Sequence, residues 1–233
     1  MTEDKIKADR SKIIGIVKDK SVLKQDVFQI TKDSFRELKS VLEETVSDLK
    51  SNFGDYDERV NFDYKDQGDF QAEMKVAGDV LIFFMHTNVF QFEKTHSLWR
   101  SSYFKDDPAR SYVGVINVYN FLADSFKYHR TQDLGYLIAR IFINKDGHFL
   151  VQGKRQLGFL FNNILEMELD RSHMADVVNS CILYTLDFDL FTPPYQAMEE
   201  VSVTDIESLS QHLTVATGKR LGFKFSHEED DLL

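Results

Sequence analysis

Residues 60–85 read VNFDYKDQGDFQAEMKVAGDVLIFFM, and this stretch decides the fold. Apolar and polar side chains alternate along 60–65 and again along 70–76, a period of two that is typical of strands with one buried face. Between them, Gly68 stands where a tight hairpin needs a positive φ. A second short turn at Gly78 leads into a run that is apolar on both faces. We therefore predict a hairpin followed by a third, central strand.

Further strands follow along the chain. The third strand is expected over 80–92, and the next three over 112–122, 133–143 and 148–155, with a turn at 144–147 between the last two. Hairpin-type connections of this kind indicate an antiparallel meander rather than parallel strands joined by crossover helices.

Helical periodicity precedes the strands. Phe28, Phe35, Leu42 and Leu49 recur every seven residues, and no Gly or Pro interrupts 24–53. That spacing fits either a long helix packed along the sheet or the seam of a coiled-coil dimer, and we favour the helix on the sheet.

The helical period returns after the strands. Apolar residues form one stripe over 157–165 and a second over 174–185, for which Ser172 is the expected N-cap. The predicted fold class is α+β: a roughly six-stranded antiparallel meander sheet, packed by the long N-terminal helix and by C-terminal helices.

The chain is expected to form a single α+β domain over residues 24–225. A basic arm, expected to be helical, precedes it at 1–23, and an acidic tail, expected to be frayed, follows at 226–233. Residues 1–24 hold seven Lys or Arg against four Asp or Glu, a net of +3, which leaves −13 for the remainder of a chain with formal charge −10. Such an arm is expected to lie against its own acidic body or that of a partner.

Composition and motifs exclude several classes of protein. A formal charge of −10 argues against bulk coating of nucleic acid. The longest apolar run, 80–85, is far shorter than the ~20 residues of a membrane-spanning helix, and the first residues lack the apolar core of a secretory signal. Cys181 is the one cysteine, so neither an internal disulfide nor a thiolate zinc site can form. We expect a cytoplasmic protein.

Motifs for cofactors and catalysis are absent from the sequence. It contains no phosphate-binding glycine loop, no histidine pair with metal-ligand spacing and no nucleophile elbow. We therefore predict no cofactor and no metal, and we favour a non-enzymatic role.

Asp63, Glu73 and Lys75 form the first candidate site. Alternation places them on one face of the predicted hairpin, and a one-residue bulge at Gly68 would put Asp63 opposite Glu73. Two carboxylates and a lysine can hold a divalent cation and polarise a water nucleophile. Over residues 24–77 the arrangement resembles the restriction-endonuclease-like nucleases, which also place a helix before the hairpin. That resemblance implies a metal-dependent nuclease using these three residues, although in that family a helix follows the hairpin and here another strand is predicted.

The second candidate site is a polar cluster on the last predicted hairpin. Its members are Arg140, Gln152 and Lys154. A bulged turn at Gly147 would make them neighbours on one face, with Ile138, and would put Leu137 on the opposite face, with Ala139 and Ile141. Cations among aromatic residues can hold an anion or an acidic partner segment. Alternatively, Arg140 pairs with Glu166 or Glu168 on a helix that covers this face.

The third candidate is the segment 97–111, the longest irregular stretch between the predicted strands. It carries Trp99 and Arg100 close to Tyr103 and Phe104, and loops rich in aromatic residues and arginine are frequent binding surfaces. A loop that folds back over the core with Trp99 inside explains the same residues equally well.

Three functions are compatible with these sites. The leading hypothesis is a non-enzymatic binding protein, self-associating as a homodimer, whose aromatic and basic surface takes an anionic ligand or an acidic partner segment. Its expected binding residues are Trp99, Arg100, Arg140, Gln152 and Lys154. The alternatives are the metal-dependent nuclease and a small-ligand carrier with its pocket between sheet and helices.

Overall fold

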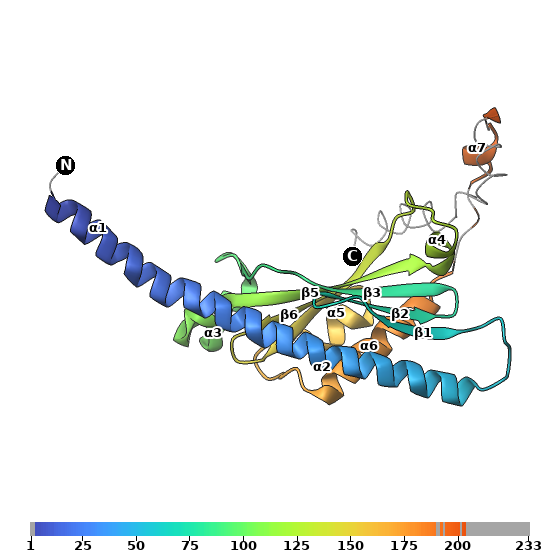
Figure 1. Cartoon of the computed structure of the whole chain (residues 1–233), viewed down its shortest axis with the longest axis horizontal. Coiled ribbons are helices and arrows are strands. Elements are labelled where there is room, and N and C mark those ends of the chain that lie inside the picture. Colours follow the sequence, from blue (N-terminus) through green and yellow to red (C-terminus); the bar gives the residue numbers. More distant parts are fainter. Residues whose placement is uncertain (1–2, 190–191, 193, 201, 204–233) are drawn as a thin grey trace.

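A seven-stranded antiparallel sheet forms the centre of the computed structural model, which describes residues 3–189, 192, 194–200 and 202–203 (Figure 1). Six strands are neighbours in meander order, β1-β2-β3-β5-β6-β7, and the short β4 pairs with β5 beyond the end of β3. The predicted α+β class and antiparallel meander are confirmed. The end of the predicted domain, 204–225, and the acidic tail, 226–233, lie outside the described residues.

The strands are β1 (Phe62–Asp66), β2 (Gln71–Val76), β3 (Asp79–Met85), β4 (Phe90–Gln91), β5 (Tyr112–Leu122), β6 (Tyr136–Asn144) and β7 (Phe149–Gly153). The α-helices are α1 (Glu3–Ile16), α2 (Val22–Phe53), α3 (Ser102–Asp106), α4 (Ala123–Lys127), α5 (Gln156–Leu160), α6 (Arg171–Leu186) and α7 (Tyr195–Met198). A π-helical turn, η1 (Val17–Ser21), joins α1 to α2, and two 3-10 turns are η2 (Ser97–Arg100) and η3 (Pro108–Ser111). Within the described part of the chain, no helix has the length and apolar character needed to cross a bilayer.

One helical rod runs from α1 through η1 and α2, so the helix begins well before its predicted start at residue 24. Gly54, at φ +54°, ends it, and the Gly54 N–H bonds back to the Lys50 carbonyl. The heptad residues Phe35 and Leu42 are buried against the sheet. The heptad stripe therefore serves packing within the chain, as we favoured.

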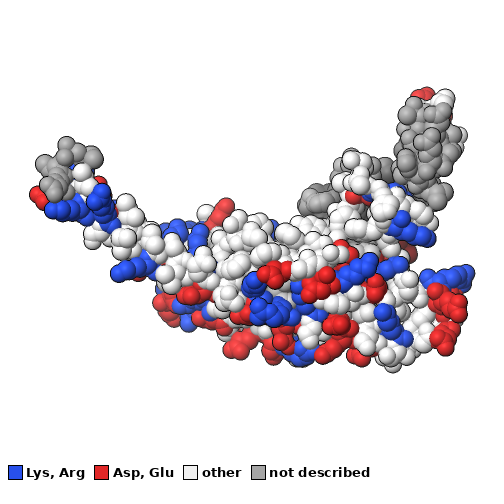
Figure 2. All heavy atoms as spheres, in the orientation of Figure 1, with Lys and Arg blue, Asp and Glu red and all other residues white. Residues whose placement is uncertain are grey.

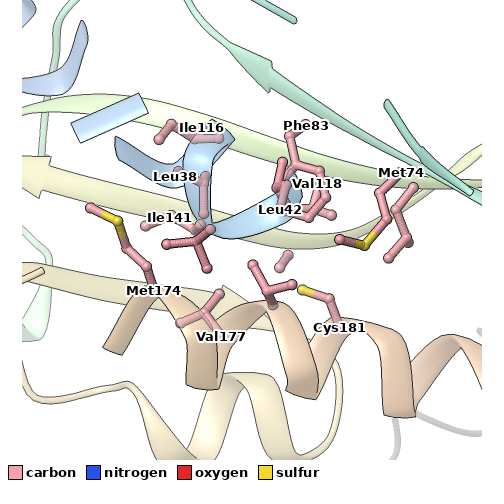
Figure 3. Close-up of a cluster of buried hydrophobic side chains, with 14 of the residues drawn as sticks. Leu38, Leu42, Met74, Phe83, Ile116, Val118, Ile141, Met174, Val177 and Cys181 are labelled. Carbon is pink, nitrogen blue, oxygen red and sulfur yellow. The ribbon is translucent and has the colours of Figure 1, made fainter. Parts of the chain in front are cut away.

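Two helices cover one face of the sheet. In Figure 3, Leu38 and Leu42 of α2 and Val177 of α6 meet side chains of the central strands such as Phe83 and Ile141, all of them buried. Close packing of this kind supplies most of the apolar burial that stabilises a domain.

The start of α6 differs from the prediction. Asp170, not Ser172, is the N-cap, because its carboxylate accepts the backbone N–H of His173 at 2.8 Å. Both residue types are good caps, so the sequence alone could not choose between them.

The predicted third strand, 80–92, is divided in two. The Nδ1 atom of His86 accepts the N–H of Asn88 at 3.0 Å, and such a local side-chain bond turns the backbone away from the ladder. β3 therefore ends at Met85, and β4 resumes the pairing with β5 only at Phe90.

The helix predicted over 157–165 is also shorter, since α5 ends at Leu160. The following residues run along the open side of β7. The N–H of Val151 donates to the Phe161 carbonyl, and the N–H of Phe149 donates to the Met167 carbonyl. This segment therefore satisfies the outer edge of the sheet instead of covering a face.

The rod approaches the sheet very closely at Gly114 in β5. The Thr31 side chain of α2 is fully buried there, and a β-carbon on Gly114 would lie 1.9 Å from Thr31 Oγ1. The Thr31 hydroxyl donates to the Val27 carbonyl at 2.7 Å, so its burial leaves no donor unpaired. Glycine is required here by the approach of the helix.

We predict that Gly114→Ala lowers the free energy of unfolding by about 1–3 kcal/mol, because the added methyl overpacks the helix–sheet contact. Urea denaturation followed by circular dichroism measures this change. Gly78→Ala is the matched control, since a β-carbon at Gly78 meets no atom within 4 Å. Equal stabilities of the two variants would contradict the assigned contact.

Cys181 lies inside the α6–sheet interface, and burial raises the pKa of its thiol to about 12. Because the thiolate is the reactive form, we expect the native protein to resist a thiol reagent such as DTNB at mildly alkaline pH and to react fully once unfolded. Labelling of the native protein at the rate of a free cysteine would show that α6 does not cover this position.

Candidate functional site

The face of the sheet opposite α2 and α6 carries a groove of about 1000 Å³, which we call the sheet groove. β5, β6 and β7 form its floor, and the segment 86–98 forms a wall. Its apolar lining includes Phe92, Val115, Tyr119, Leu137, Phe142 and Leu150.

Arg140 lies in this groove on β6, directly opposite Gln152 on β7. Its Nη2 donates to Gln152 Oε1 at 2.5 Å, and its guanidinium carbon lies 5.5 Å from the centroid of the Phe142 ring. Among the described residues, no carboxylate lies within ion-pair distance of Arg140. The guanidinium is therefore hydrogen-bonded to a neutral amide, and its positive charge has no described carboxylate beside it.

The alternative that paired Arg140 with an acidic residue of a covering helix is wrong. Glu168 lies 3.8 Å from the His148 ring, at the edge of the sheet, and Glu166 accepts a hydrogen bond from Asn163. Both glutamates belong to the segment that runs along β7, so neither lies over the groove.

A β-bulge explains why Leu137 lines the groove rather than the core. Val118 pairs with Ala139 and Tyr119 pairs with Leu137, so Ile138 is the extra residue in β6. Ile138 is buried and Leu137 is 41 % exposed, which reverses the facing that we expected from alternation. A bulge shifts all residues on one side of it to the other face.

Two histidines in the groove were missed by the sequence reasoning. The Nδ1 atoms of His86 and His96 accept the backbone N–H groups of Asn88 and Leu98, at 3.0 and 3.3 Å. Because a backbone N–H only donates, the neutral rings carry their proton on Nε2, which adds two donors to a groove that already holds a cation. His86 is half-buried, and isolated histidines carry no spacing signal that could have placed either of them.

Trp99 and Arg100 do not line the sheet groove. The Trp99 Nε1 donates to the Phe92 carbonyl at 3.2 Å, and its ring packs against Phe104, which is fully buried. Arg100 is exposed beside it. The segment thus folds back over the core, and its neighbour Leu98 contributes to the wall of the groove.

The same segment is fastened to the turn between β6 and β7. The Tyr103 hydroxyl donates to Asp146 Oδ2 at 3.1 Å and accepts from Asn144 Nδ2 at 2.8 Å, and Arg110 Nε donates to Asp146 at 2.7 Å. Burial raises the pKa of Tyr103 to about 12, so its hydroxyl keeps the proton that it donates. These bonds hold the groove wall in place.

Lys154 belongs to a different hollow. Its backbone N–H bonds to Ile138, but the residue lines a pocket of about 340 Å³ together with Arg155, Leu183 and Tyr184. The structure therefore brings together Arg140 and Gln152 and separates the other three predicted binding residues from them.

Asp63, Glu73 and Lys75 surround a smaller pocket of about 250 Å³, which Lys65 and Lys127 also line. Asp63 pairs with Lys75 and Glu73 with Lys65 across the strands, so the expected pairing of the two carboxylates is wrong. The pairing of β1 with β2 contains no bulge, and a one-residue bulge was needed to bring Asp63 opposite Glu73. Within the described residues, no group of three or more His, Cys, Asp or Glu side chains is placed to hold a metal ion.

No protein-family model, curated protein or solved structure matches this chain. The function proposed below therefore rests on the geometry of the sheet groove.

We expect millimolar Mg²⁺ or Mn²⁺ to leave the melting temperature unchanged. Hard cations take about six oxygen ligands, whereas the small pocket offers two carboxylates beside three lysines. A thermal-shift assay measures this. A rise of several degrees that Glu73→Ala abolishes would instead establish a metal site and support the nuclease alternative.

Proposed function

We propose that this protein is a non-enzymatic binding protein whose sheet groove takes an acidic segment of a partner protein. One observation carries the proposal: half-buried Arg140 lies in a largely apolar floor between two neutral amides, Asn117 and Gln152, and its hydrogen-bonded partner is Gln152. A cation that loses hydration is stabilised fully only when an opposite charge replaces the water. A carboxylate in the groove would supply it through a charge-assisted hydrogen bond.

The size and lining of the sheet groove favour a chain segment over a small ion. A volume of about 1000 Å³ is at the upper end of the range for small-molecule sites. Aromatic and aliphatic side chains line most of its floor, and Glu93 is the one acidic residue among the described residues that line it. A segment with an acidic residue between apolar ones would bury its apolar side chains while its carboxylate meets Arg140.

The two alternatives have less support. The nuclease residues face lysines across the strands, so their carboxylates are not paired around a common point. The layer between sheet and helices, where a carrier would hold its ligand, is filled by side chains of the core. We also propose a cytoplasmic location, since the one cysteine is a free, buried thiol.

Selection of a random peptide library against the full chain tests this proposal. We expect enriched peptides to carry Asp or Glu flanked by aromatic or aliphatic residues. Arg140→Gln is expected to weaken a selected peptide roughly 10- to 100-fold in fluorescence anisotropy, because a charge-assisted bond is lost. Arg36→Gln is the matched control, since Arg36 lies on α2 and its ion pair with Asp33 is exposed.

A second variant keeps the test decisive if Arg140→Gln folds poorly. Gln152→Glu places a carboxylate beside the guanidinium, so it should weaken the peptide while leaving the melting temperature unchanged or higher. Enrichment of peptides without acidic residues, or peptides indifferent to both variants, would overturn the proposal. Thermal stabilisation by tripolyphosphate without enrichment of any peptide would identify a small anionic ligand instead.

A further inference from the structure

The N-terminal arm, residues 3–21 of α1 and η1, projects past the sheet. Lys20 and Lys24 each place Nζ 5.9 Å from the ring centroid of Tyr112, at the start of β5. N-terminal to that contact the rod stands clear of the body, with Lys and Arg side chains along it (Figure 2).

The middle of the arm exposes a compact apolar patch. Ile13, Ile14 and Ile16 are each more than half exposed, and Val17 is 47 % exposed. Gly15 lies at the centre of the patch, where a β-carbon would touch nothing within 4 Å. The bare backbone lets another element approach closely, and a continuous apolar patch of this kind marks a docking surface.

Charge indicates what covers this patch. Residues 1–24 carry a net of +3 and the rest of the chain −13. Two arms packed on each other would bring like charges together, whereas an arm packed on the body of another copy would bring opposite charges together.

The body has a groove suited to an apolar, basic helix. We call it the helix groove: a hollow of about 260 Å³ between α2 and α6. Val41, Leu49 and Ala175 supply its apolar lining, and Glu44 and Asp48 supply carboxylates. Arg171 also lines the hollow and pairs with Glu44, so Asp48 is the carboxylate left for a lysine of the arm. No cation of the described residues pairs with Asp48.

We infer that the arm of one copy docks in the helix groove of a second copy, and that the two copies exchange arms to form a closed dimer. α1 and η1, of 14 and 5 residues, span about 28 Å, and the 32 residues of α2 span about 48 Å. Two rods lying antiparallel therefore place each arm along the other copy's α2, so both contacts form at once under a two-fold axis. This inference does not depend on the sheet groove.

Sedimentation equilibrium of the full chain tests the exchange. We expect a dimer, and Ile13→Gln/Ile16→Gln should raise its dissociation constant at least roughly 100-fold, because two apolar contacts are lost in each copy. Ala8→Gln/Ser11→Gln is the matched control, which changes exposed, smaller residues of the same arm. A monomer at all micromolar concentrations, or a dimer that the isoleucine variant leaves intact, would overturn the inference.

Cross-linking shows which surfaces meet. One variant carries Ile14→Cys in the arm and another carries Asn179→Cys at the helix groove, while native Cys181 is buried. Mixing the two under mild oxidation should yield a disulfide between unlike variants. A link formed chiefly between two Ile14→Cys arms would show that the arms pair with each other and would rule out the exchange.

Discussion

The Thr31 side chain fills the space beside Gly114, and that contact determines how closely the long helix lies on the sheet. With α2 this close, and α6 packed beside it, one face of the sheet is closed by buried side chains such as Phe83 and Ile141. Alternate residues of the same strands must then point to the other face. The sheet groove, with Arg140 in its floor, is the direct result of that division.

The alternation of apolar and polar side chains, together with the glycines at the turns, made much of the fold predictable. A strand with one buried face must alternate, so β1 and β2 could be predicted from 60–76, and the positive φ of Gly68 and Gly147 confirms both hairpin turns. The bulge at Ile138 could not be predicted, because its neighbours are also apolar and either could face the core. The break after β3 depends on the His86 side chain bonding to the backbone, which alternation does not report.

Only part of the candidate site could be predicted from the sequence. Counting the register from the turn at Gly147 gives the pairing of Arg140 with Gln152. Whether a helix covers that pair depends on the path of the chain after β7, and no local pattern encodes that path. β7 ends at Gly153, and Lys154 and Arg155, the latter at φ +48°, lie beyond it and line another pocket.

The π-helical turn η1 divides the long rod into two parts whose side chains are rotated relative to each other about the helix axis. A π turn inserts one residue and rotates everything beyond it by roughly 100°. In an uninterrupted α-helix, Ile13 and Ile16 would fall in line with Val27 and Thr31, on the side that meets the sheet. With the extra residue, Ile13 and Ile16 point away from the side of the rod that meets the sheet. A single inserted amino acid thus gives one continuous helix two apolar sides aimed in different directions, the inner serving its own fold and the outer directed away from it.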